Sequence, residues 1–222
     1  DVVLLDACGD APDVARYARE ASIERIVCAF TAAGVESREL DPSLSDAAVQ
    51  ALSGVMAVTG AERGAPELVR VPLCELTTAV AGAGAVMAAL AVRERDGGGQ
   101  LIDMALVDVM ADQLRTHIAI AKGGQADSFR IGCRHPLCSP WNAYRAADGW
   151  VLICSASDVQ WDKILDVVGR PDLKGDATFA TAAARKKVIL EVDELVQSWT
   201  GSRSMAEVVQ AFSAVGIPAG PA

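Results

Sequence analysis

The chain has 222 residues, of which 51% are hydrophobic and 22% are charged, and its formal net charge is −9. This length is enough for one large domain or two small ones, each with a real core. The negative charge argues against nucleic acid or an anionic membrane as the main partner, because both attract basic surfaces. An anionic small molecule stays compatible, because it needs only a local basic pocket or a helix N-terminus.

The ends and the apolar runs of the chain bear on its location. The longest uncharged run, Leu76 to Val92, is shorter than the roughly 20 residues that span a bilayer, so we expect no membrane segment. The chain opens at Asp1 on an apolar run without a basic leader, which predicts no signal peptide. The missing initiator Met indicates a processed, trimmed or excerpted chain. We therefore expect a cytoplasmic protein.

Six cysteines, at positions 8, 28, 74, 133, 138 and 154, lie mostly inside apolar runs. We interpret them as buried, reduced thiols in a reducing compartment. Cys133, His135 and Cys138 could together suggest zinc. Their spacing is irregular and no second pair of ligands follows, so we predict no metal site.

The first part of the chain alternates strand and helix patterns. Two short apolar runs, VVLLDA and RIVCAFTA, flank a helical pattern at Asp13–Ala21, and this order predicts a βαβ unit with a parallel sheet. Further on we expect helices at Asp46–Met56, Glu75–Arg95 and Val107–Ala121, with a strand at GQLIDMAL. The glycines 97–99 follow a helix, so they predict a helix-to-strand turn rather than a phosphate loop.

The composition changes after Lys122. Trp141–Ser157 contains an Asp-Gly turn between strand-like pieces, which predicts a hairpin. Helical stripes follow, and Ser204 with Glu207 predicts a capping box that starts a helix to Val215. We therefore predict an α/β fold in two domains, a parallel-sheet domain at 1–122 and a connector with a small α+β domain at 123–222.

Glu75 is the only charged residue from Val71 to Val92, a span of 22 positions. From the residues alone, a carboxylate at this place favours a helix N-terminus, where the helix dipole stabilises it. The other interpretation is that this carboxylate acts on a substrate.

Several segments in this order resemble the family III CoA-transferases, the group named for formyl-CoA transferase and carnitine CoA-transferase. The matching residues are Asp46 with VQALSGVMAVTG, then VPLCELTTAVAGAGAVMAALAVRERDGGGQLIDMALVD, then HPLCSPWNAYRAADGWVLI, Phe179–Arg185 and the final GIPAGPA. The resemblance implies a Rossmann-like large domain, here partial, a small domain and an interlocked homodimer. It also implies that the family's first strand and helix precede Asp1, and that its last segment follows Ala222.

The resemblance places Glu75 at the family's catalytic aspartate. A carboxylate there would attack an acyl-CoA thioester, form a mixed anhydride and then an enzyme–CoA thioester, and pass CoA to an acceptor carboxylic acid. Coenzyme A thioesters would be substrates, and no metal would take part. The helix N-terminus and nearby amides would stabilise the oxyanions. For an acyl pocket the candidates are His135, Trp141 and Tyr144, although a backbone-bonded histidine and core aromatics are the plainer interpretation.

A second hypothesis is a non-catalytic, degenerate relative that pairs with an active partner or homologous domain. It is favoured by Glu75 in place of Asp, by Cys74 where the family usually has Gly, and by the stretch 6–20, which lacks the run that resembles a CoA-contact loop. The related racemases carry a His just before the aspartate that matches Asp46. Ser45 stands there in this chain, which argues against racemisation.

Overall fold

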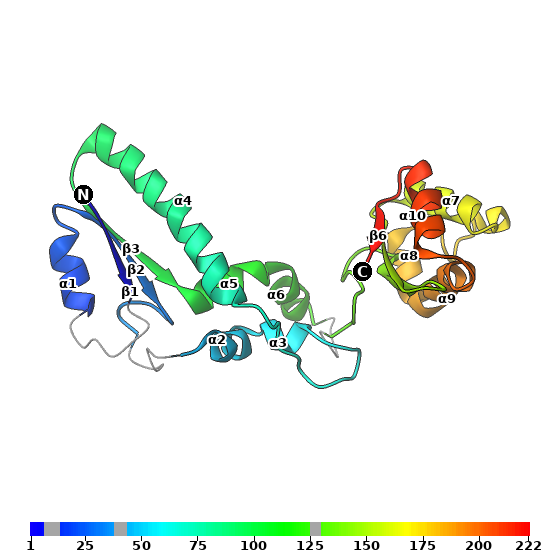
Figure 1. The fold of residues 1–222 in the computed structure, drawn as a ribbon, viewed down its shortest axis with the longest axis horizontal. Coiled ribbons are helices and arrows are strands. Elements are labelled where there is room, and N and C mark those ends of the chain that lie inside the picture. Colours follow the sequence, from blue (N-terminus) through cyan, green and yellow to red (C-terminus); the bar gives the residue numbers. More distant parts are fainter. Residues whose placement is uncertain (7–13, 38–43, 125–129) are drawn as a thin grey trace. The chain divides into compact units, whose positions relative to one another are not determined.

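The computed structural model describes residues 1–6, 14–37, 44–124 and 130–222, and these form two compact units, Asp1–Arg130 and Ile131–Ala222. The first unit contains a parallel sheet in the order β1-β2-β3, made of Val2–Asp6, Ile26–Thr31 and Gln100–Ala105 (Figure 1). Helix α1 (Val14–Ala21) connects β1 to β2. The second unit has an antiparallel sheet, so the predicted α/β fold with a second α+β part is confirmed.

Strand β1 differs from β2 in how much of it is buried. All of β2 is buried except Phe30, which is partly exposed, whereas Leu4 of β1 is 65% exposed. Among the described residues β1 pairs only with β2, so it is the edge of the sheet. The predicted parallel pairing of the two apolar runs is confirmed, and β1 is the more exposed of the two strands.

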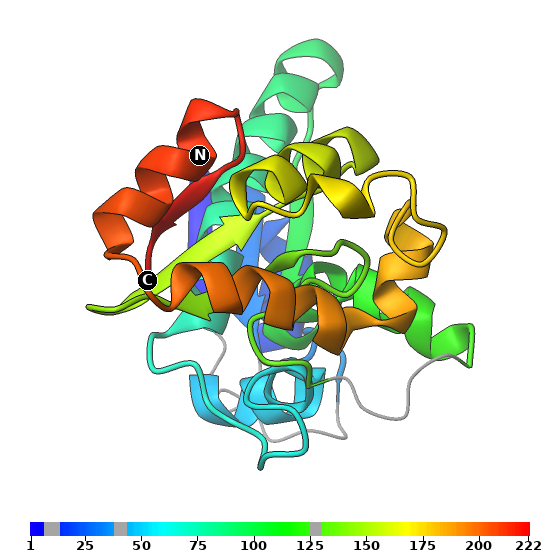
Figure 2. The same cartoon turned by 90° about the vertical axis from the view of Figure 1, so that its right-hand side faces the viewer.

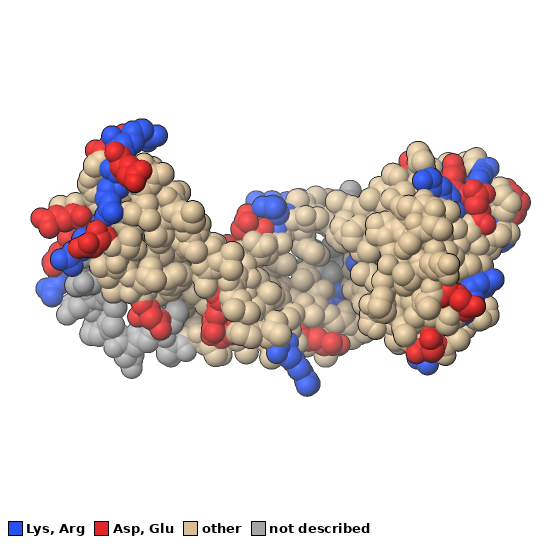
Figure 3. Space-filling model, turned by 45° about the horizontal axis from the view of Figure 1, so that its top comes forward, with Lys and Arg blue, Asp and Glu red and all other residues tan. Residues whose placement is uncertain are grey.

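Helix α4 (Leu73–Asp96) lies along the sheet and packs on β2 and β3. The approach is close because Gly82 has no side chain: a Cβ atom there would lie 2.7 Å from the ring of Phe30. The opposite face of the helix carries Leu76, Val80 and Met87, all exposed in this structure. Figure 3 shows uncharged residues covering much of this part of the surface up to the charged end of the helix. By length and composition alone α4 could also cross a membrane, but its contacts with the sheet make it a covering helix.

The glycines after α4 form the turn that the sequence predicted. Gly97 and Gly98 have φ of 74° and 84°, values that L side chains rarely adopt. At Gly99 space is the constraint, because a Cβ atom would lie 2.1 Å from the carbonyl oxygen of Ser22. The turn thus brings the chain from α4 directly into β3.

Two expected helices are each divided in two. The segment after residue 45 forms α2 (Asp46–Ser53) and α3 (Val55–Val58), separated by Gly54 at φ 93°. The segment after β3 forms α5 (Leu106–Gln113) and α6 (Arg115–Lys122), separated at Leu114. The hydrophobic spacing continues across both breaks, which is why the sequence predicted single helices.

The two units divide after Arg130, whereas the sequence placed the boundary after Lys122. Arg130 belongs to the first unit because its guanidinium donates to the carbonyls of Gly64, at 3.0 Å, and Ala57, at 3.3 Å. These bonds join Arg130 to α3 and to the loop that follows it. The composition change at Lys122 marks the end of α6 instead.

The second unit is built around the predicted hairpin, β4 (Trp141–Arg145) and β5 (Trp150–Cys154). A third strand, β6 (Ala219–Pro221), pairs with β5 and was not predicted. Figure 2 shows the surrounding helices, which are α7 (Asp158–Val167), α8 (Ala182–Lys187), α9 (Ile189–Thr200) and α10 (Met205–Ala214), with the short 3-10 helix η1 (Pro171–Leu173). The capping box of Ser204 and Glu207 at the start of α10 is confirmed.

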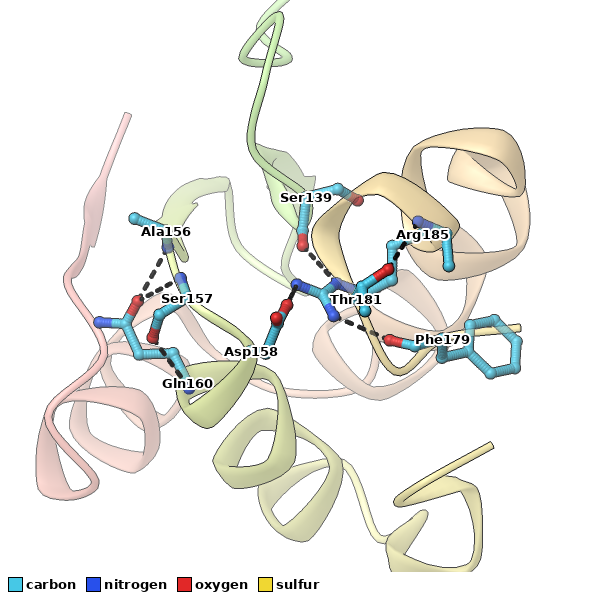
Figure 4. A network of polar contacts seen from close by, with 9 residues as sticks. Ser139, Ala156, Ser157, Asp158, Gln160, Phe179, Thr181 and Arg185 are labelled. Atoms are coloured by element: carbon cyan, nitrogen blue, oxygen red, sulfur yellow. Dashed lines mark hydrogen bonds and ion pairs between the residues drawn. The ribbon is translucent and has the colours of Figure 1, made fainter. Parts of the chain in front are cut away.

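Arg185 of α8 lies at the centre of a polar network in this unit, with 1% of the residue exposed (Figure 4). Its guanidinium donates to the carbonyl of Ser139 at 2.7 Å, the carbonyl of Phe179 at 2.8 Å and the carboxylate of Asp158 at 2.8 Å. It also lies 5.3 Å from the ring centre of Trp161. One side chain thereby connects the segment before β4, the start of α7 and the loop before α8.

The five described cysteines are all free thiols, and Cys8 lies outside the described residues. Cys28 and Cys74 are buried, as predicted. Cys138 and Cys154 are only partly buried, and Cys133 is exposed, so the expectation of burial was wrong for Cys133. It lies in the irregular segment before β4, where no helix or strand packs it into a core.

Candidate functional site

The starts of α2 and α4 meet at the carboxylate of Asp46. Its Oδ1 accepts hydrogen bonds from the backbone N–H of Cys74 at 2.7 Å and of Glu75 at 3.1 Å. Asp46 is the first residue of α2, where Ser45 is the N-cap and accepts from the N–H of Ala48. An acidic side chain of one helix thus caps the N-terminus of another, which is a favourable place for a negative charge.

Gln50 holds the second oxygen of the same carboxylate. Its Nε2 donates to Asp46 Oδ2 at 2.7 Å and to the carbonyl of Val69 at 3.0 Å, while its Oε1 accepts from the N–H of Val69 at 3.0 Å. Gln50 is only 1% exposed, so all these bonds are made away from water. The loop that leads into α4 is therefore fixed to α2 on two sides.

Every backbone amide of the first turn of α4 has an acceptor. Those of Cys74 and Glu75 bond to Asp46, that of Leu73 bonds to the carbonyl of Val71, and that of Leu76 bonds to Pro72. The amides of this first turn are therefore not free to stabilise an oxyanion as the resemblance implied, because Asp46 already accepts from two of them and backbone carbonyls accept from the other two. Donors for a reaction at this helix must come from other groups.

Glu75 itself is exposed at the start of α4. Its neighbour Cys74 is fully buried, and Cys74 Sγ lies 3.8 Å from the carbonyl oxygen of Asp46. Burial, followed by the nearby carboxylate of Asp46, raises the pKa of the Cys74 thiol to about 12. The thiol therefore stays protonated at neutral pH, and the exposed carboxylate is the group that faces solvent.

The pocket candidates lie in the second unit, and their surroundings differ. His135 Nδ1 accepts from the N–H of Leu137 and of Cys138, both at 3.1 Å, and its ring lies 4.7 Å from that of Trp141. Both rings are partly exposed. Their pocket role stays a prediction.

Tyr144 is a core residue of the second unit, with 2% of its surface exposed. Its hydroxyl donates to Asp193 Oδ1 at 2.7 Å, and Asp193 also binds Arg134 at 2.7 Å. Burial and then the Asp193 carboxylate raise the pKa of Tyr144 well above its ordinary value. Within this unit the side chain holds β4 to α9, as the interpretation of Tyr144 as a core aromatic expects.

Asp46 was expected only as part of the segment that resembles the family, and Gln50 was not predicted as a site residue. A signal was present, because Gln50 is the polar residue inside the apolar run VQAL, four positions after Asp46 and hence on the same helix face. A polar side chain at a buried helical position needs hydrogen-bond partners. Of the stretch 6–20, predicted to lack a CoA-contact loop, residues 7–13 lie outside the described residues.

Comparison with known proteins identifies the family. Residues 19–222 match the sequence profile of CoA-transferase family III. The chain belongs to this family. It is 30% identical over 196 residues to a succinate–glutarate CoA-transferase of Agrobacterium fabrum, and 34% identical over 170 residues to a succinyl-CoA:mesaconate CoA-transferase of Haloarcula hispanica.

These matches cover 88% and 76% of this chain, and 49% and 42% of the two relatives. A solved structure, a CaiB/BaiF family protein from Brucella suis, is 26% identical with a TM-score of 0.74, and the match covers 100% of this chain and 60% of the other. The chain thus spans about half the length of the two curated relatives. The family resemblance seen in the sequence is confirmed.

Proposed function

We propose that this family III chain takes part in CoA transfer from an acyl-CoA to a carboxylic acid, with Glu75 as the nucleophile. The observation that carries the proposal is an exposed carboxylate at the start of α4, on a backbone fixed by Asp46, in a chain that belongs to the family. A carboxylate is a suitable nucleophile here because each intermediate it forms stays activated for the next acyl transfer.

The reaction balances without an added acid or oxidant. The Glu75 carboxylate attacks the thioester carbonyl, and the C–S bond breaks to give a mixed anhydride and the CoA thiolate. The thiolate attacks the glutamyl carbonyl, which releases the donor carboxylate and leaves a glutamyl–CoA thioester. The acceptor carboxylate then displaces CoA to form a second anhydride, and the thiolate attacks its acceptor carbonyl, which restores Glu75.

The relatives suggest which substrates to test first. One is named for succinate and glutarate and another for succinyl-CoA and mesaconate, all of them dicarboxylic acids or their thioesters. We propose a dicarboxylic acid and its CoA thioester as the substrate class. The second carboxylate of such a substrate would bind a basic side chain or free amides. The amides of the first turn of α4 are already occupied, so these groups would lie elsewhere.

A non-catalytic role is the second candidate, and one observation favours it. The amides next to Glu75 are all occupied, so the first turn of α4 offers no free backbone amide to an oxyanion. In that case the chain would support a homologous domain or subunit that carries the active carboxylate.

The test is covalent trapping in the full parent protein. Succinyl-CoA, glutaryl-CoA and acetyl-CoA are each added, the mixture is quenched with hydroxylamine, and peptides are mapped by mass. A hydroxamate on Glu75 that is lost in Glu75→Gln, and kept in the matched exposed variant Glu94→Gln on the same helix, would support the transferase. CoA binding without a Glu75 adduct would support the non-catalytic role.

We also propose that a protein surface, either a second copy or a homologous domain, covers the outer face of α4. The exposed side chains of Leu76, Val80 and Met87 favour this, because large apolar side chains gathered on one helix face usually have a partner. The net charge of −9 argues against nucleic acid or an anionic membrane as this partner. We also propose a cytoplasmic location. The molecular mass of the parent protein in solution tests the second copy, because a dimer has twice the mass of one chain.

A further inference from the structure

The carboxylate of Asp46 is committed to three donors. Oδ1 accepts from the amides of Cys74 and Glu75, and Oδ2 accepts from the side chain of Gln50. Hydrogen bonds to an ionised acceptor are shorter and stronger than neutral ones, so this contact fixes the start of α4 more firmly than a neutral cap would. A carboxylate with both oxygens engaged is poorly suited to exchange protons with a substrate.

One of these bonds ends on the backbone of Glu75 itself. The amide nitrogen of Glu75 lies 3.1 Å from Asp46 Oδ1, and this nitrogen is bonded directly to the Cα atom that bears the side chain. The position and direction of the Glu75 Cα–Cβ bond therefore follow from where Asp46 holds this peptide. An error of about 1 Å in a reacting group can reduce a rate about 100-fold.

We propose that Asp46 is a positioning residue for Glu75, acting through the backbone amides that open α4, and that Gln50 in turn positions Asp46. This inference rests on the proposed role of Glu75 as nucleophile. It gives Asp46 no contact with the substrate.

The state of Cys74 agrees with this assignment. A helix N-terminus ordinarily favours a thiolate, because the free amides and the helix dipole stabilise its charge. Here Asp46 occupies those amides and places a negative charge beside the thiol, and the thiol stays protonated. Burial is the main cause of the raised pKa of this thiol and the Asp46 carboxylate adds to it, so the carboxylate that orients Glu75 also helps to keep the adjacent thiol neutral.

The alternative is that Asp46 only ties α2 to α4 for stability. The two roles differ in what the loss of the carboxylate changes. A tie for stability changes the melting temperature and leaves the rate of the folded protein intact. A positioning residue changes the rate of acylation of Glu75, while the apparent affinity for acyl-CoA stays the same.

The experiment uses the full parent protein with saturating succinyl-CoA, and it measures the single-turnover rate of hydroxylamine-trapped adduct on Glu75. We expect Asp46→Ala to lower this rate about 100-fold with KM for acyl-CoA unchanged. Asp46→Asn keeps one oxygen that can accept both amides, so its rate should lie between those of Asp46→Ala and the wild type. If Asp46→Ala does not fold, Asp46→Asn carries the test.

Ser45→Ala is the matched control, because it removes the N-cap bond of the same helix without touching α4. It should lower stability and leave the trapping rate unchanged. Hydrogen exchange of the peptide that begins at Leu73 supplies a readout independent of activity: the amides of Cys74 and Glu75 should exchange faster in Asp46→Ala and not in Ser45→Ala.

Two results overturn the inference. If Asp46→Ala, or Asp46→Asn where Asp46→Ala does not fold, melts lower but acylates Glu75 at the wild-type rate, Asp46 has only a structural role, and the proposed function stands. If the wild type itself forms no adduct on Glu75, the proposed function fails and the positioning role fails with it.

Discussion

Replacing Arg185 with methionine tests the central network of the second unit. The substitution keeps an unbranched chain in the core but removes the donors to the Ser139 carbonyl, the Phe179 carbonyl and the Asp158 carboxylate. Because Arg185 is only 1% exposed, water does not readily replace its guanidinium, and the two carbonyls are left without a donor. Each buried acceptor that is left without a donor costs about 1–3 kcal/mol of the free energy of unfolding, so the two carbonyls together cost about 2–6 kcal/mol. For a unit of this size the melting temperature should fall by roughly 8 °C or more.

Tryptophan fluorescence during urea unfolding is a suitable assay, because all four tryptophans of this sequence (141, 150, 161 and 199) lie in the second unit. Arg170→Met is the control: Arg170 pairs with Asp172 on the surface, where the side chain is 44% exposed. The control should change the free energy of unfolding by about 0.5 kcal/mol or less. A loss below about 1 kcal/mol in Arg185→Met would refute the reasoning, because it would mean that the network contributes no more than a surface pair.

Three further substitutions test features of the fold. The thiol of Cys74 has a pKa near 12 in the folded state against 9.0 as its ordinary value, so its contribution to stability is complete below pH 9 and is lost as the pH rises toward 12. From about pH 8 to pH 10 the wild type should therefore lose about 1.4 kcal/mol more than Cys74→Ala, measured by urea unfolding. Gly99→Ala should lower the free energy of unfolding by about 3 kcal/mol, because its Cβ would overlap backbone atoms of Ser22 and Arg25. Ser204→Ala should lower it by about 1 kcal/mol through loss of the α10 cap, measured by thermal unfolding.

Each has an outcome that contradicts it. Parallel pH curves for the wild type and Cys74→Ala would mean that the thiol titrates normally. A Gly99→Ala protein as stable as the wild type would mean that the turn before β3 shifts freely. No change in Ser204→Ala would mean that the cap is replaced by solvent.

Local patterns predicted the elements whose causes are local. The apolar run of β2, the Asp-Gly hairpin of β4 and β5 and the capping box at Ser204 each depend on residues close together in sequence, and each is confirmed. Strand β6 was missed because its residues are proline, glycine and alanine, which rarely form strands. Its pairing depends on β5, some 70 residues earlier.

In the site, too, the sequence predicted Glu75 but not the contacts that depend on residues distant in sequence. The lone charge in an apolar segment pointed to Glu75, and the family resemblance added its chemistry. The bonds from Asp46 to the amides of α4 span 28 and 29 positions, and no spacing rule connects residues that far apart. Likewise Gly54 ends α2 at φ 93°, but it lies in the middle of a continuous hydrophobic pattern, and this pattern alone predicted one helix.

The sheet of the first unit pairs two strands that are synthesised far apart in time. β2 pairs with β3 in parallel, Ile26 beside Gln100, so a nascent chain carries the apolar run of β2 for about 70 residues before its second partner exists. The β4–β5 hairpin, in contrast, closes from Arg145 to Trp150 as soon as both strands emerge. During translation the first unit therefore has the longer interval in which unpaired strand edges can aggregate, and chaperones would act on it first.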